Sequence, residues 1–479
     1  MLNYLCQLYQ KYTILTNMKF WYRMKQLILL LVDILLFYFS LWLALAIRNL
    51  SFTNTEQINT LLPIFSGIFL LWIILKYING LYDFKKIGQR NFINIHIQTT
   101  IVSFFLSIAI LYFFPTSDVN PKTILFLNVI IAYLLTFLWR KLYVIIISNE
   151  KLKANILFLD YNEEVQEIIE ILKKQKTLGY IVKSIRDVDD KLKQEKLENI
   201  HIYDEHKNIA DIVENDKINI IVTHNNLNKN ENLTQELYQL LFKQIKITSI
   251  SNFYESVTGR IPPSAFYKSW FLQYLSDLDK PIYNKFTRLL DFISILFFGL
   301  LFVVFLPFIA LAIKLNSKGK IFFKQKRLGQ NGKVFWMYKF RTMYSLAEDG
   351  SAEMHGAEFA QKNDKRITST GKFLRKTRLD ELPQVINLIK GEITIIGPRP
   401  ERPEIISHLK KQVTYYDLRY LVKPGITGWA QVQLNYTDTM ETYLQKLQYD
   451  LFYIKNRSIL LDLSILLKTV NVILRAMGQ

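Results

Sequence analysis

The sequence has little cysteine and little glycine. Its 479 residues include a single cysteine, Cys6, and 17 glycines. One thiol forms no disulfide within the chain, so the folded parts need no oxidising compartment. The first apolar run is not followed by a small-residue cleavage site, and a cleavable signal peptide is therefore not expected.

Motifs of several enzyme classes are missing as well. The sequence contains no G-x-x-x-x-G-K-[ST] phosphate loop, no H-E-x-x-H and no Cys/His cluster with zinc spacing. It does not suggest a Ser–His–Asp triad either. The candidate catalytic groups that remain are one acidic pair and several arginines.

Apolar residues and positive charge are abundant. Hydrophobic residues make up 50% of the chain, aromatic residues 14%, and the formal net charge is +19. These values predict an integral membrane protein with soluble parts. The charge is typical of cytoplasmic flanks that face anionic lipid, or of a site for a phosphorylated ligand. So apolar a sequence argues against nucleic acid as the partner.

Four apolar runs come before residue 150. They lie at 26–47, 61–78, 99–114 and 123–139. A spanning helix needs about 20 apolar residues, so all four are predicted to cross the bilayer rather than to form buried core helices. Asp33 is the main charge inside them, which is little for a transporter, and it either pairs with another helix or snorkels.

Positive charge alternates between the connecting segments. It precedes the first run, recurs between the second and third, and follows the fourth, whereas the other two loops carry little. By the positive-inside rule the amino terminus, the middle loop and everything after residue 140 are predicted to be cytoplasmic. The residues concerned are Lys11, Lys19, Arg23, Lys25, Lys85, Lys86, Arg90, Arg140 and Lys141.

A fifth apolar run, at 292–313, has basic residues at both ends and Pro307 inside it. Crossing the bilayer would translocate a strongly basic stretch, and proline removes a backbone hydrogen bond and favours a bend. A re-entrant helix that bends at Pro307 is therefore favoured over a fifth, proline-kinked span.

The middle segment, 154–255, has soluble character. Apolar strands at its start, at 218–224 and at 245–250 alternate with helical stretches, which predicts a small doubly wound domain. The turn after the first strand, LDYNEEV, has no glycine, whereas a dinucleotide fold needs one there for the backbone to approach a pyrophosphate. A structural or regulatory domain is favoured over a nucleotide site.

The acidic pair stands in RKTRLDELPQ, residues 375–384. LDELPQVINLIKG is predicted to be one helix that Asp380 caps and Gly391 ends. Asp380 and Glu381 point about 100° apart on a helix, so they cannot flank one bond as a glycosidase pair does. They can divide the work, with one carboxylate at the reaction centre and the other orienting a metal or a water.

A carboxylate repels phosphate, so the pair needs neutralising charge. Mg²⁺ binds carboxylate and phosphate oxygens together, which makes Asp380 and Glu381 candidate metal ligands. Arg341, Arg375 and Arg399 offer forked contacts to phosphoryl oxygens. The alternative is structural: Asp380 as a helix cap paired with Arg378, and Glu381 as a surface charge.

Four motifs follow one another in the second half of the chain: KFRTM (339–343), LRKTRLDELPQ (374–384), GEITIIGPRP (391–400) and KPGITGWAQV (423–432). In this order, behind a proline-containing apolar run, they resemble the bacterial sugar transferases, polyprenyl-phosphate hexose-1-phosphate transferases that start exopolysaccharide, capsule or O-antigen assembly. The resemblance covers roughly residues 284–479, and the four spans and degenerate α/β domain resemble the larger, undecaprenyl-phosphate glucose phosphotransferase type.

The resemblance implies a mechanism. Asp380 matches the nucleophile that attacks the sugar-linked phosphate of a UDP-sugar and releases UMP, before undecaprenyl phosphate takes the phosphosugar. Glu381 matches the partner carboxylate that aids Mg²⁺ or the second substrate, Arg375 and Arg399 match phosphate-binding positions, and Lys339 with Arg341 lies near the site. The family's apolar segment is re-entrant. The family often has serine before the proline, where this chain has Leu306, so the stabilisation of the bend is open.

The predicted organisation is a bacterial inner-membrane protein with its catalytic domain in the cytoplasm. It comprises four transmembrane helices (1–147), a Rossmann-like domain (148–260), a linker (261–284) and an α/β catalytic domain (285–479) with a re-entrant helix at about 287–313. Expected partners are a UDP-sugar, undecaprenyl phosphate and the bilayer. The amino-terminal region offers an interface for a homodimer, but the sequence does not decide the oligomeric state. A glycosyltransferase releasing UDP and an inactive scaffold or nucleotide sensor are the alternatives.

Overall fold

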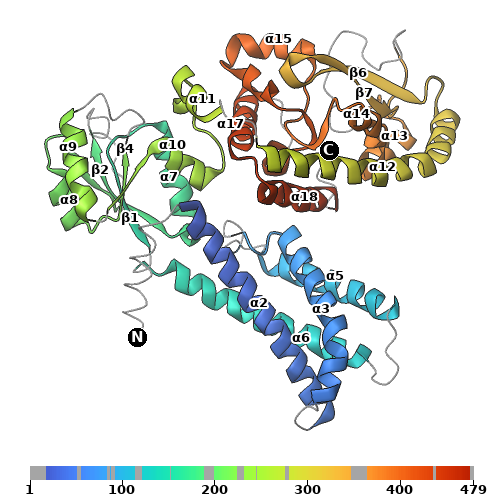
Figure 1. Ribbon diagram of the computed structural model, residues 1–479, viewed down its shortest axis with the longest axis horizontal. Helices are drawn as coiled ribbons and strands as arrows, with labels where there is room; N and C mark the ends of the chain where they lie inside the picture. The colour runs from blue at the N-terminus through green and yellow to red at the C-terminus, as the bar shows by residue number, and fades with distance from the viewer. Residues whose placement is uncertain are drawn as a thin grey trace. The chain divides into compact units, whose positions relative to one another are not determined.

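The computed structural model describes most of the chain, in two units, Met1–Thr258 and Gly259–Gln479 (Figure 1). The described residues are 18–50, 55–83, 87, 92–113, 121–150, 153–187, 199–223, 231–243, 245–275, 280–346, 364–434 and 439–474.

Helices form at all four amino-terminal apolar runs. Each contains a segment long and apolar enough to cross a membrane. α6 packs against α2 and α5, and α3 packs against α5. Apolar side chains on the outer faces remain exposed, which suits contact with lipid. The helices are α2 (Met18–Asn49), α3 (Thr55–Ile78), α5 (Phe92–Phe113) and α6 (Pro121–Ser148).

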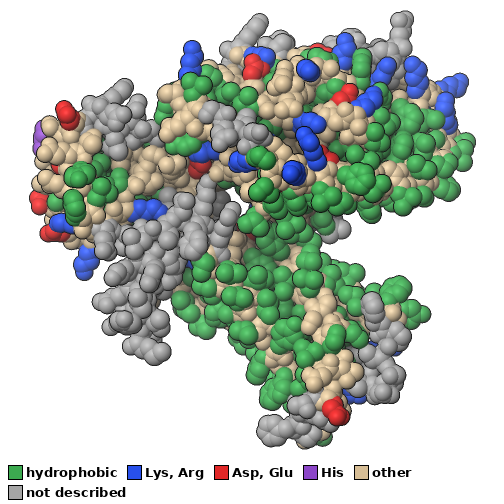
Figure 2. All heavy atoms as spheres, in the orientation of Figure 1, with side chains coloured by type: hydrophobic (Ala, Val, Ile, Leu, Met, Phe, Trp, Pro, Cys, Tyr) green, Lys and Arg blue, Asp and Glu red, His purple; other side chains and the backbone are tan. Residues whose placement is uncertain are grey.

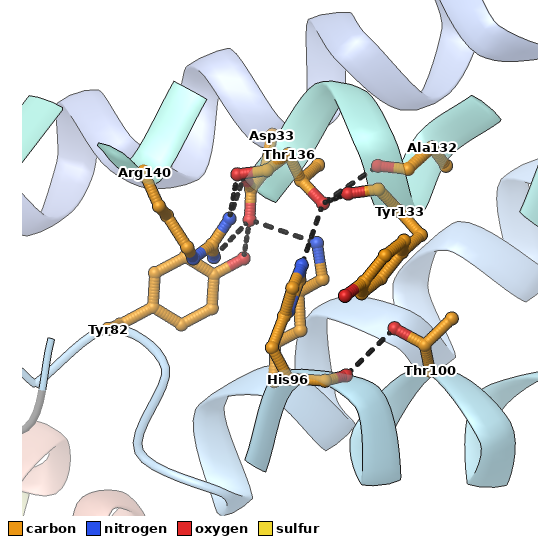
Figure 3. Close-up of polar contacts among 9 residues, drawn as sticks. Asp33, Tyr82, His96, Thr100, Ala132, Tyr133, Thr136 and Arg140 are labelled. Atoms are coloured by element: carbon orange, nitrogen blue, oxygen red, sulfur yellow. Dashed lines mark hydrogen bonds and ion pairs between the residues drawn. The ribbon is translucent and has the colours of Figure 1, made fainter. Parts of the chain in front are cut away.

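A buried polar network joins these helices (Figure 3). Arg140 on α6 forks onto Asp33 on α2, with Nη1 donating to Oδ1 at 2.8 Å and Nη2 to Oδ2 at 2.7 Å. Tyr82 donates its hydroxyl to the same Oδ2 at 2.8 Å, and Lys76 Nζ on α3 lies 3.5 Å from it. Asp33 thus pairs with another helix.

The network corrects two sequence-based interpretations. Arg140 belongs to the interior of the bundle rather than to a flank, because α6 continues as far as Ser148. The interpretation of Asp33 as the main charge inside the bundle is also incomplete, because Lys76 is buried there beside it.

Breaking the Asp33–Arg140 pair should destabilise the bundle. We expect Arg140→Met to lower the free energy of unfolding by about 3–5 kcal/mol, because it leaves a buried carboxylate without its forked partner. The double variant Asp33→Leu/Arg140→Met should recover most of that loss. Chemical unfolding of the full chain in detergent measures both effects. An Arg140→Met variant as stable as the wild type would show that the pair contributes nothing.

The rest of the first unit confirms the predicted doubly wound domain. Its five parallel strands lie in the order β3-β2-β1-β4-β5. α7 and α10 cover an apolar core on one face of the sheet, and α8 and α9 cover another. The strands are β1 (Ala154–Phe158), β2 (Tyr180–Asp187), β3 (His201–Asp204), β4 (Ile220–Thr223) and β5 (Lys246–Ser249). The helices are α7 (Glu163–Lys174), η2 (Lys176–Leu178), α8 (Ile209–Asn215), α9 (Glu231–Leu240), η4 (Leu241–Lys243) and α10 (Ile250–Thr258).

The amino end of α7 is poorly suited to a phosphate. Asn162 caps it, its Oδ1 accepting from Val165 N at 2.9 Å, and Glu163 and Glu164 occupy the first turn. The positive end of the helix dipole therefore already faces carboxylates of the chain itself. This disfavours a pyrophosphate where a dinucleotide fold holds one.

The second unit surrounds one large apolar core, to which α17 contributes Leu447, Leu451 and Ile454. The predicted linker 261–284 contributes Trp270 and Phe271 to the same core, so this segment belongs to the folded unit. β6 and β7 form an antiparallel hairpin, and β8 pairs with β9 in parallel.

The elements of this unit lie in the following order. The first are η5 (Pro263–Ala265), α11 (Lys268–Leu275), α12 (Pro281–Asn316), β6 (Phe322–Leu328), η6 (Gln330–Gly332) and β7 (Val334–Phe340). Next come α13 (Ser369–Thr377), η7 (Leu379–Gln384), α14 (Val385–Ile389), β8 (Thr394–Ile396) and α15 (Pro403–Gln412). The last are η8 (Tyr416–Leu421), β9 (Gly425–Thr427), α16 (Trp429–Gln433), α17 (Met440–Asn456) and α18 (Ile459–Leu474).

The long apolar helix α12 contacts this unit near both of its ends. Asp291, near its start, accepts hydrogen bonds from Thr394 Oγ1 at 2.7 Å and from Ile395 N at 2.9 Å. Ile309 and Ile313, past Pro307, pack into a second small core of the unit. Figure 1 shows the ribbon bending towards its carboxy-terminal end.

The remaining surface of α12 is apolar and exposed. Only 6% of its most apolar stretch is buried. Figure 2 shows hydrophobic side chains gathered over this part of the molecule. An apolar patch of this extent marks an interaction surface, and it fits lipid. The exposed side chains include Leu289, Phe292, Ile293, Leu296, Phe297, Leu300, Val303, Phe308, Leu311 and Leu315.

Candidate active site

The acidic pair lies in a tight turn between two short helices. α13 ends at Thr377 and is capped by Arg378, whose backbone is left-handed with φ 60°. Asp380 and Glu381 follow in the 3₁₀ helix η7, and α14 begins only at Val385. The prediction of a single helix capped by Asp380 was therefore wrong, because Arg378 redirects the chain and the tighter turn precedes α14. The predicted stop is correct, since Gly391 takes φ 70° just after α14.

Glu381 gathers three cations. Its Oε1 lies 3.0 Å from Lys339 Nζ, 3.4 Å from Arg399 Nη2 and 3.8 Å from Arg378 Nη1. Burial alone would raise the pKa of Glu381, but the positive charges of these three side chains hold it well below its usual range. Glu381 is therefore ionised at any physiological pH and fixes the cations around the site.

Asp380 is buried and lacks a hydrogen bond to one of its carboxylate oxygens within the described part of the chain. The residue is 6% exposed, and the oxygen concerned is Oδ1. Burial raises the pKa of Asp380, the positive charge of Lys339 opposes this, and the negative charge of Glu381 adds to it. A desolvated carboxylate oxygen without a partner, beside cations, is suited to attack an electrophile.

Asn387 on α14 fixes the strand that carries Lys339. Its Oδ1 accepts from Tyr338 N at 3.1 Å and its Nδ2 donates to Trp336 O at 2.7 Å. The fully buried amide therefore ties β7 to the helix that follows the acidic pair. Asn387 could not be chosen from the sequence, since a lone asparagine within an apolar helix gives no signal of such a contact.

Two glycine-containing motifs fold together to present Arg399. Gly397 N, at the end of β8, donates to Thr427 O at 2.8 Å, and Gly425 N donates to Pro398 O at 2.9 Å. A Cβ on Gly397 would meet Lys423 O at 2.5 Å, so only glycine allows this approach. GEITIIGPRP and KPGITGWAQV are thus the two sides of one structure that carries Arg399.

The other predicted arginines differ in their surroundings. Arg375, in the last turn of α13, donates from Nε to Thr342 Oγ1 at 2.9 Å, and its charge lowers the pKa of Asp380. Arg341 makes its contacts elsewhere, since its guanidinium donates to the carbonyls of Ser317, at 2.7 Å, and of Lys318, just beyond α12. A phosphate-binding role for Arg341 remains a prediction, whereas its observed contacts hold the end of α12.

Arg341→Lys should therefore affect stability more than turnover. Lysine cannot fork onto two carbonyls, and we expect the melting temperature in detergent to fall by several degrees. Turnover per folded molecule should stay within about threefold of wild type, because no contact to Asp380 or Glu381 is lost. A loss of about thirtyfold or more with unchanged melting would instead assign Arg341 to phosphate binding.

Among the described residues, no three or more His, Cys, Asp or Glu side chains gather as a ready-made metal site. Mg²⁺, however, commonly uses one or two carboxylates and completes its shell with substrate phosphates and water. The partnerless Oδ1 of Asp380 fits such a ligand, while Oε1 of Glu381 is already shared by cations. The donor set thus fits a magnesium ion that arrives with a phosphorylated substrate.

Comparison with known proteins places the site in a family. The family model described as bacterial sugar transferase matches residues 282–476. An exopolysaccharide production protein of Rhizobium leguminosarum is 38% identical over 188 residues, which are 38% of this chain and 92% of that protein. The chain belongs to the bacterial sugar transferase family.

Longer sugar transferases also match. A UDP-N-acetylgalactosamine-undecaprenyl-phosphate N-acetylgalactosaminephosphotransferase of Aeromonas hydrophila is 38% identical over 234 residues, 49% of this chain and 53% of that protein. A UDP-glucose:undecaprenyl-phosphate glucose-1-phosphate transferase of Xanthomonas campestris is 42% identical over 173 residues, 36% of this chain and 34% of that protein. The chain thus spans about half or less of these two relatives. All the predicted site residues lie within the part that the family model matches.

Proposed function

We propose that this protein transfers a sugar 1-phosphate from a UDP-sugar to undecaprenyl phosphate and releases UMP. The relatives with matching catalytic parts are named for transfer of glucose 1-phosphate or N-acetylgalactosamine phosphate to undecaprenyl phosphate. The product would be an undecaprenyl-pyrophosphoryl sugar, the first membrane intermediate of an exopolysaccharide, a capsule or an O-antigen.

The observation that carries the proposal is the contrast between the two adjacent carboxylates. Glu381 is neutralised by three cations, whereas Asp380 is buried and its Oδ1 has no hydrogen-bond partner among the described residues. If the pair served only as a helix cap and a surface charge, Asp380 would be hydrogen-bonded and Glu381 solvated. One carboxylate organises positive charge and the other is left reactive, which is the division that covalent transfer needs.

The reaction consists of two displacements at one phosphorus. In the first, an oxygen of Asp380 bonds to the sugar-linked phosphorus, and the bond to the bridging oxygen breaks so that UMP leaves with the electron pair. In the second, a phosphate oxygen of undecaprenyl phosphate bonds to the same phosphorus and expels the Asp380 carboxylate. All the nucleophiles and leaving groups are anions, so neither step needs a proton.

The cations around the pair stabilise the charge that develops on the phosphoryl oxygens. Lys339 and Arg399 already converge on Glu381, and Arg375 is within electrostatic reach of Asp380. A bound Mg²⁺ would supply Lewis-acid neutralisation of the diphosphate. Asp380, with substrate phosphates, would hold it.

The long helix α12 supports placing the reaction at the membrane surface. A helix of 36 residues crossing a bilayer would carry one end to the far side, yet the same folded unit contacts this helix near both ends. We therefore propose that α12 is re-entrant, bends at Pro307 and stays in the cytoplasmic leaflet of the bacterial inner membrane. The catalytic unit would then meet the lipid phosphate at headgroup depth.

Two other functions make different predictions. A glycosyltransferase attacking the sugar carbon would release UDP, and an inactive scaffold or nucleotide sensor would release nothing. The Asp380 oxygen, which no described residue contacts by a hydrogen bond, argues against the scaffold. The carboxylates at the amino end of α7 argue against a nucleotide sensor.

The test identifies the released nucleotide. Full-length protein in nanodiscs would be given undecaprenyl phosphate, Mg²⁺ and a panel of UDP-sugars that includes glucose, galactose and N-acetylated amino sugars. UMP release is expected, and the most active donor names the sugar. UDP release would overturn the proposal in favour of ordinary glycosyl transfer, and absence of both nucleotides across the panel would favour the scaffold.

A further inference from the structure

The loop that carries Arg399 is fixed by hydrogen bonds to its main-chain carbonyls. Gly425 N donates to Pro398 O at 2.9 Å, and Leu328 N donates to Glu401 O at 3.0 Å. Prolines flank Arg399 on both sides and restrict φ further. These contacts fix the two ends of a short segment around one functional arginine.

The two carbonyls between these ends are held by buried or half-buried arginine side chains. Arg419 Nη2 donates to the main-chain oxygen of Arg399 itself at 3.0 Å. Arg327 Nη1 donates to Pro400 O at 3.1 Å. Four consecutive carbonyls, 398–401, therefore each accept a hydrogen bond from another part of the second unit.

Arg419 is itself held rigidly. It is 2% exposed, and the same Nη2 that donates to the loop also donates to Asp450 Oδ2, on α17, at 2.7 Å. Its Nη1 donates to Tyr416 OH at 2.6 Å and lies 3.6 Å from Glu401 Oε1. All of these partners are buried, so the guanidinium has little freedom to move away from the Arg399 carbonyl.

The placement of the shared nitrogen is informative. A buried ion pair between Arg419 and Asp450 would stabilise the core wherever Nη2 pointed. Here the nitrogen bridges the carboxylate and the one main-chain oxygen that belongs to Arg399, whose side chain reaches Glu381 Oε1 at 3.4 Å. A displacement of about 1 Å at a substrate-positioning group is enough to cost up to about a hundredfold in rate.

We infer that Arg419, oriented by Asp450, is a positioning residue that sets where the Arg399 guanidinium meets the substrate diphosphate. This inference rests on the proposed phosphosugar transfer. It assigns a role in the reaction to a buried pair that does not itself reach the substrate.

A double-mutant cycle tests the inference. Steady-state UMP release would be measured for Arg419→Lys, Arg399→Lys and the double variant. Lysine keeps the charge but has a single nitrogen, which cannot make the contacts of Nη2 to Asp450 and the Arg399 carbonyl together with the contact of Nη1 to Tyr416. Arg419→Lys should therefore lower kcat/KM for the UDP-sugar about tenfold or more. Once Arg399 is replaced, the further change at Arg419 should cost less than about threefold.

Arg140→Lys is the matched control. Arg140 is likewise a buried arginine that donates to a buried aspartate, but it lies in the helical bundle of the other unit. It should lower the melting temperature and leave kcat/KM unchanged. Asp450→Asn is a second route to the same test if Arg419→Lys does not fold, and it should show the same non-additivity with Arg399→Lys.

The possible outcomes distinguish failure of the positioning role of Arg419 from failure of the proposed phosphosugar transfer. An active wild type in which Arg419→Lys retains full kcat/KM, or in which the two substitutions multiply independently, overturns the positioning role and leaves the proposed function intact. A wild type that releases no UMP overturns both.

Discussion

Replacing Asp380 by asparagine should lower UMP release by about a thousandfold or more. An amide oxygen is too weak a nucleophile to displace UMP, and the substitution changes neither the size nor the shape of the side chain. The loss should appear in kcat, while the cations on Glu381 still bind the diphosphate. Steady-state UMP release from the preferred UDP-sugar, with undecaprenyl phosphate present, measures it.

Asp462→Asn is the matched control for this substitution. Asp462 is likewise a buried aspartate of the second unit, and it accepts hydrogen bonds from Tyr283 and Tyr453 rather than lying in the acidic turn. We expect this variant to retain most of its activity per folded molecule. If Asp380→Asn kept activity close to that of the wild type, Asp380 could not be the nucleophile, whatever the activity of Asp462→Asn.

Replacing Glu381 by glutamine should have the second largest effect, a fall in kcat/KM of about a hundredfold. The cations that converge on Oε1 would lose the charge that holds them together, so Lys339 and Arg399 would no longer be fixed for the phosphoryl oxygens. Glu381→Gln should therefore act by displacing the cations that bind phosphate, whereas Asp380→Asn removes the attacking group itself.

Glu381→Gln should also shift the pH dependence, and the direction is fixed by charge. Burial, aided by the negative charge of Glu381, raises the pKa of Asp380, and activity requires the ionised form. In the wild type kcat/KM should therefore fall, as the pH is lowered, at a pH above the usual range for aspartate. Removing the charge of Glu381 lowers the pKa of Asp380 and moves this acid limb to lower pH.

The pH profiles of the two proteins decide this point. Wild type and Glu381→Gln would be assayed across the acid range in buffers of constant ionic strength. An acid limb that stays in place or moves to higher pH would contradict the electrostatic coupling between the two carboxylates. The size of the rate loss alone would leave the coupling undecided, so the profile is the measurement that matters.

Local patterns made much of this architecture predictable. The apolar runs fixed where the long helices would form, because length and hydropathy suffice for that. Strand and helix periodicity in 154–255 gave the doubly wound domain, including a first turn unsuited to a pyrophosphate. The acidic pair and Arg399 could be chosen because four motifs with a shared resemblance carry them.

Contacts between distant residues could not be predicted. Arg341 and Arg375 were equally good candidates for phosphate binding on sequence alone. In the structure Arg341 donates to carbonyls just beyond α12, whereas the charge of Arg375 acts on Asp380. Arg419 bonds to a residue 20 positions away and to another 31 positions away, and no local pattern encodes either contact. Arg140 resembles a flanking charge until the helix that carries it is known to continue inward.

The covalent intermediate tests the central claim most directly. Full-length protein would be mixed with the preferred UDP-sugar and Mg²⁺ in the absence of undecaprenyl phosphate, with UMP quantified and the protein mass measured. The account predicts a burst of no more than one UMP per chain and a phosphosugar on the peptide containing Asp380, which disappears when undecaprenyl phosphate is added. If no UMP forms and the protein stays unmodified until the lipid is added, transfer is direct and Asp380 is not the nucleophile.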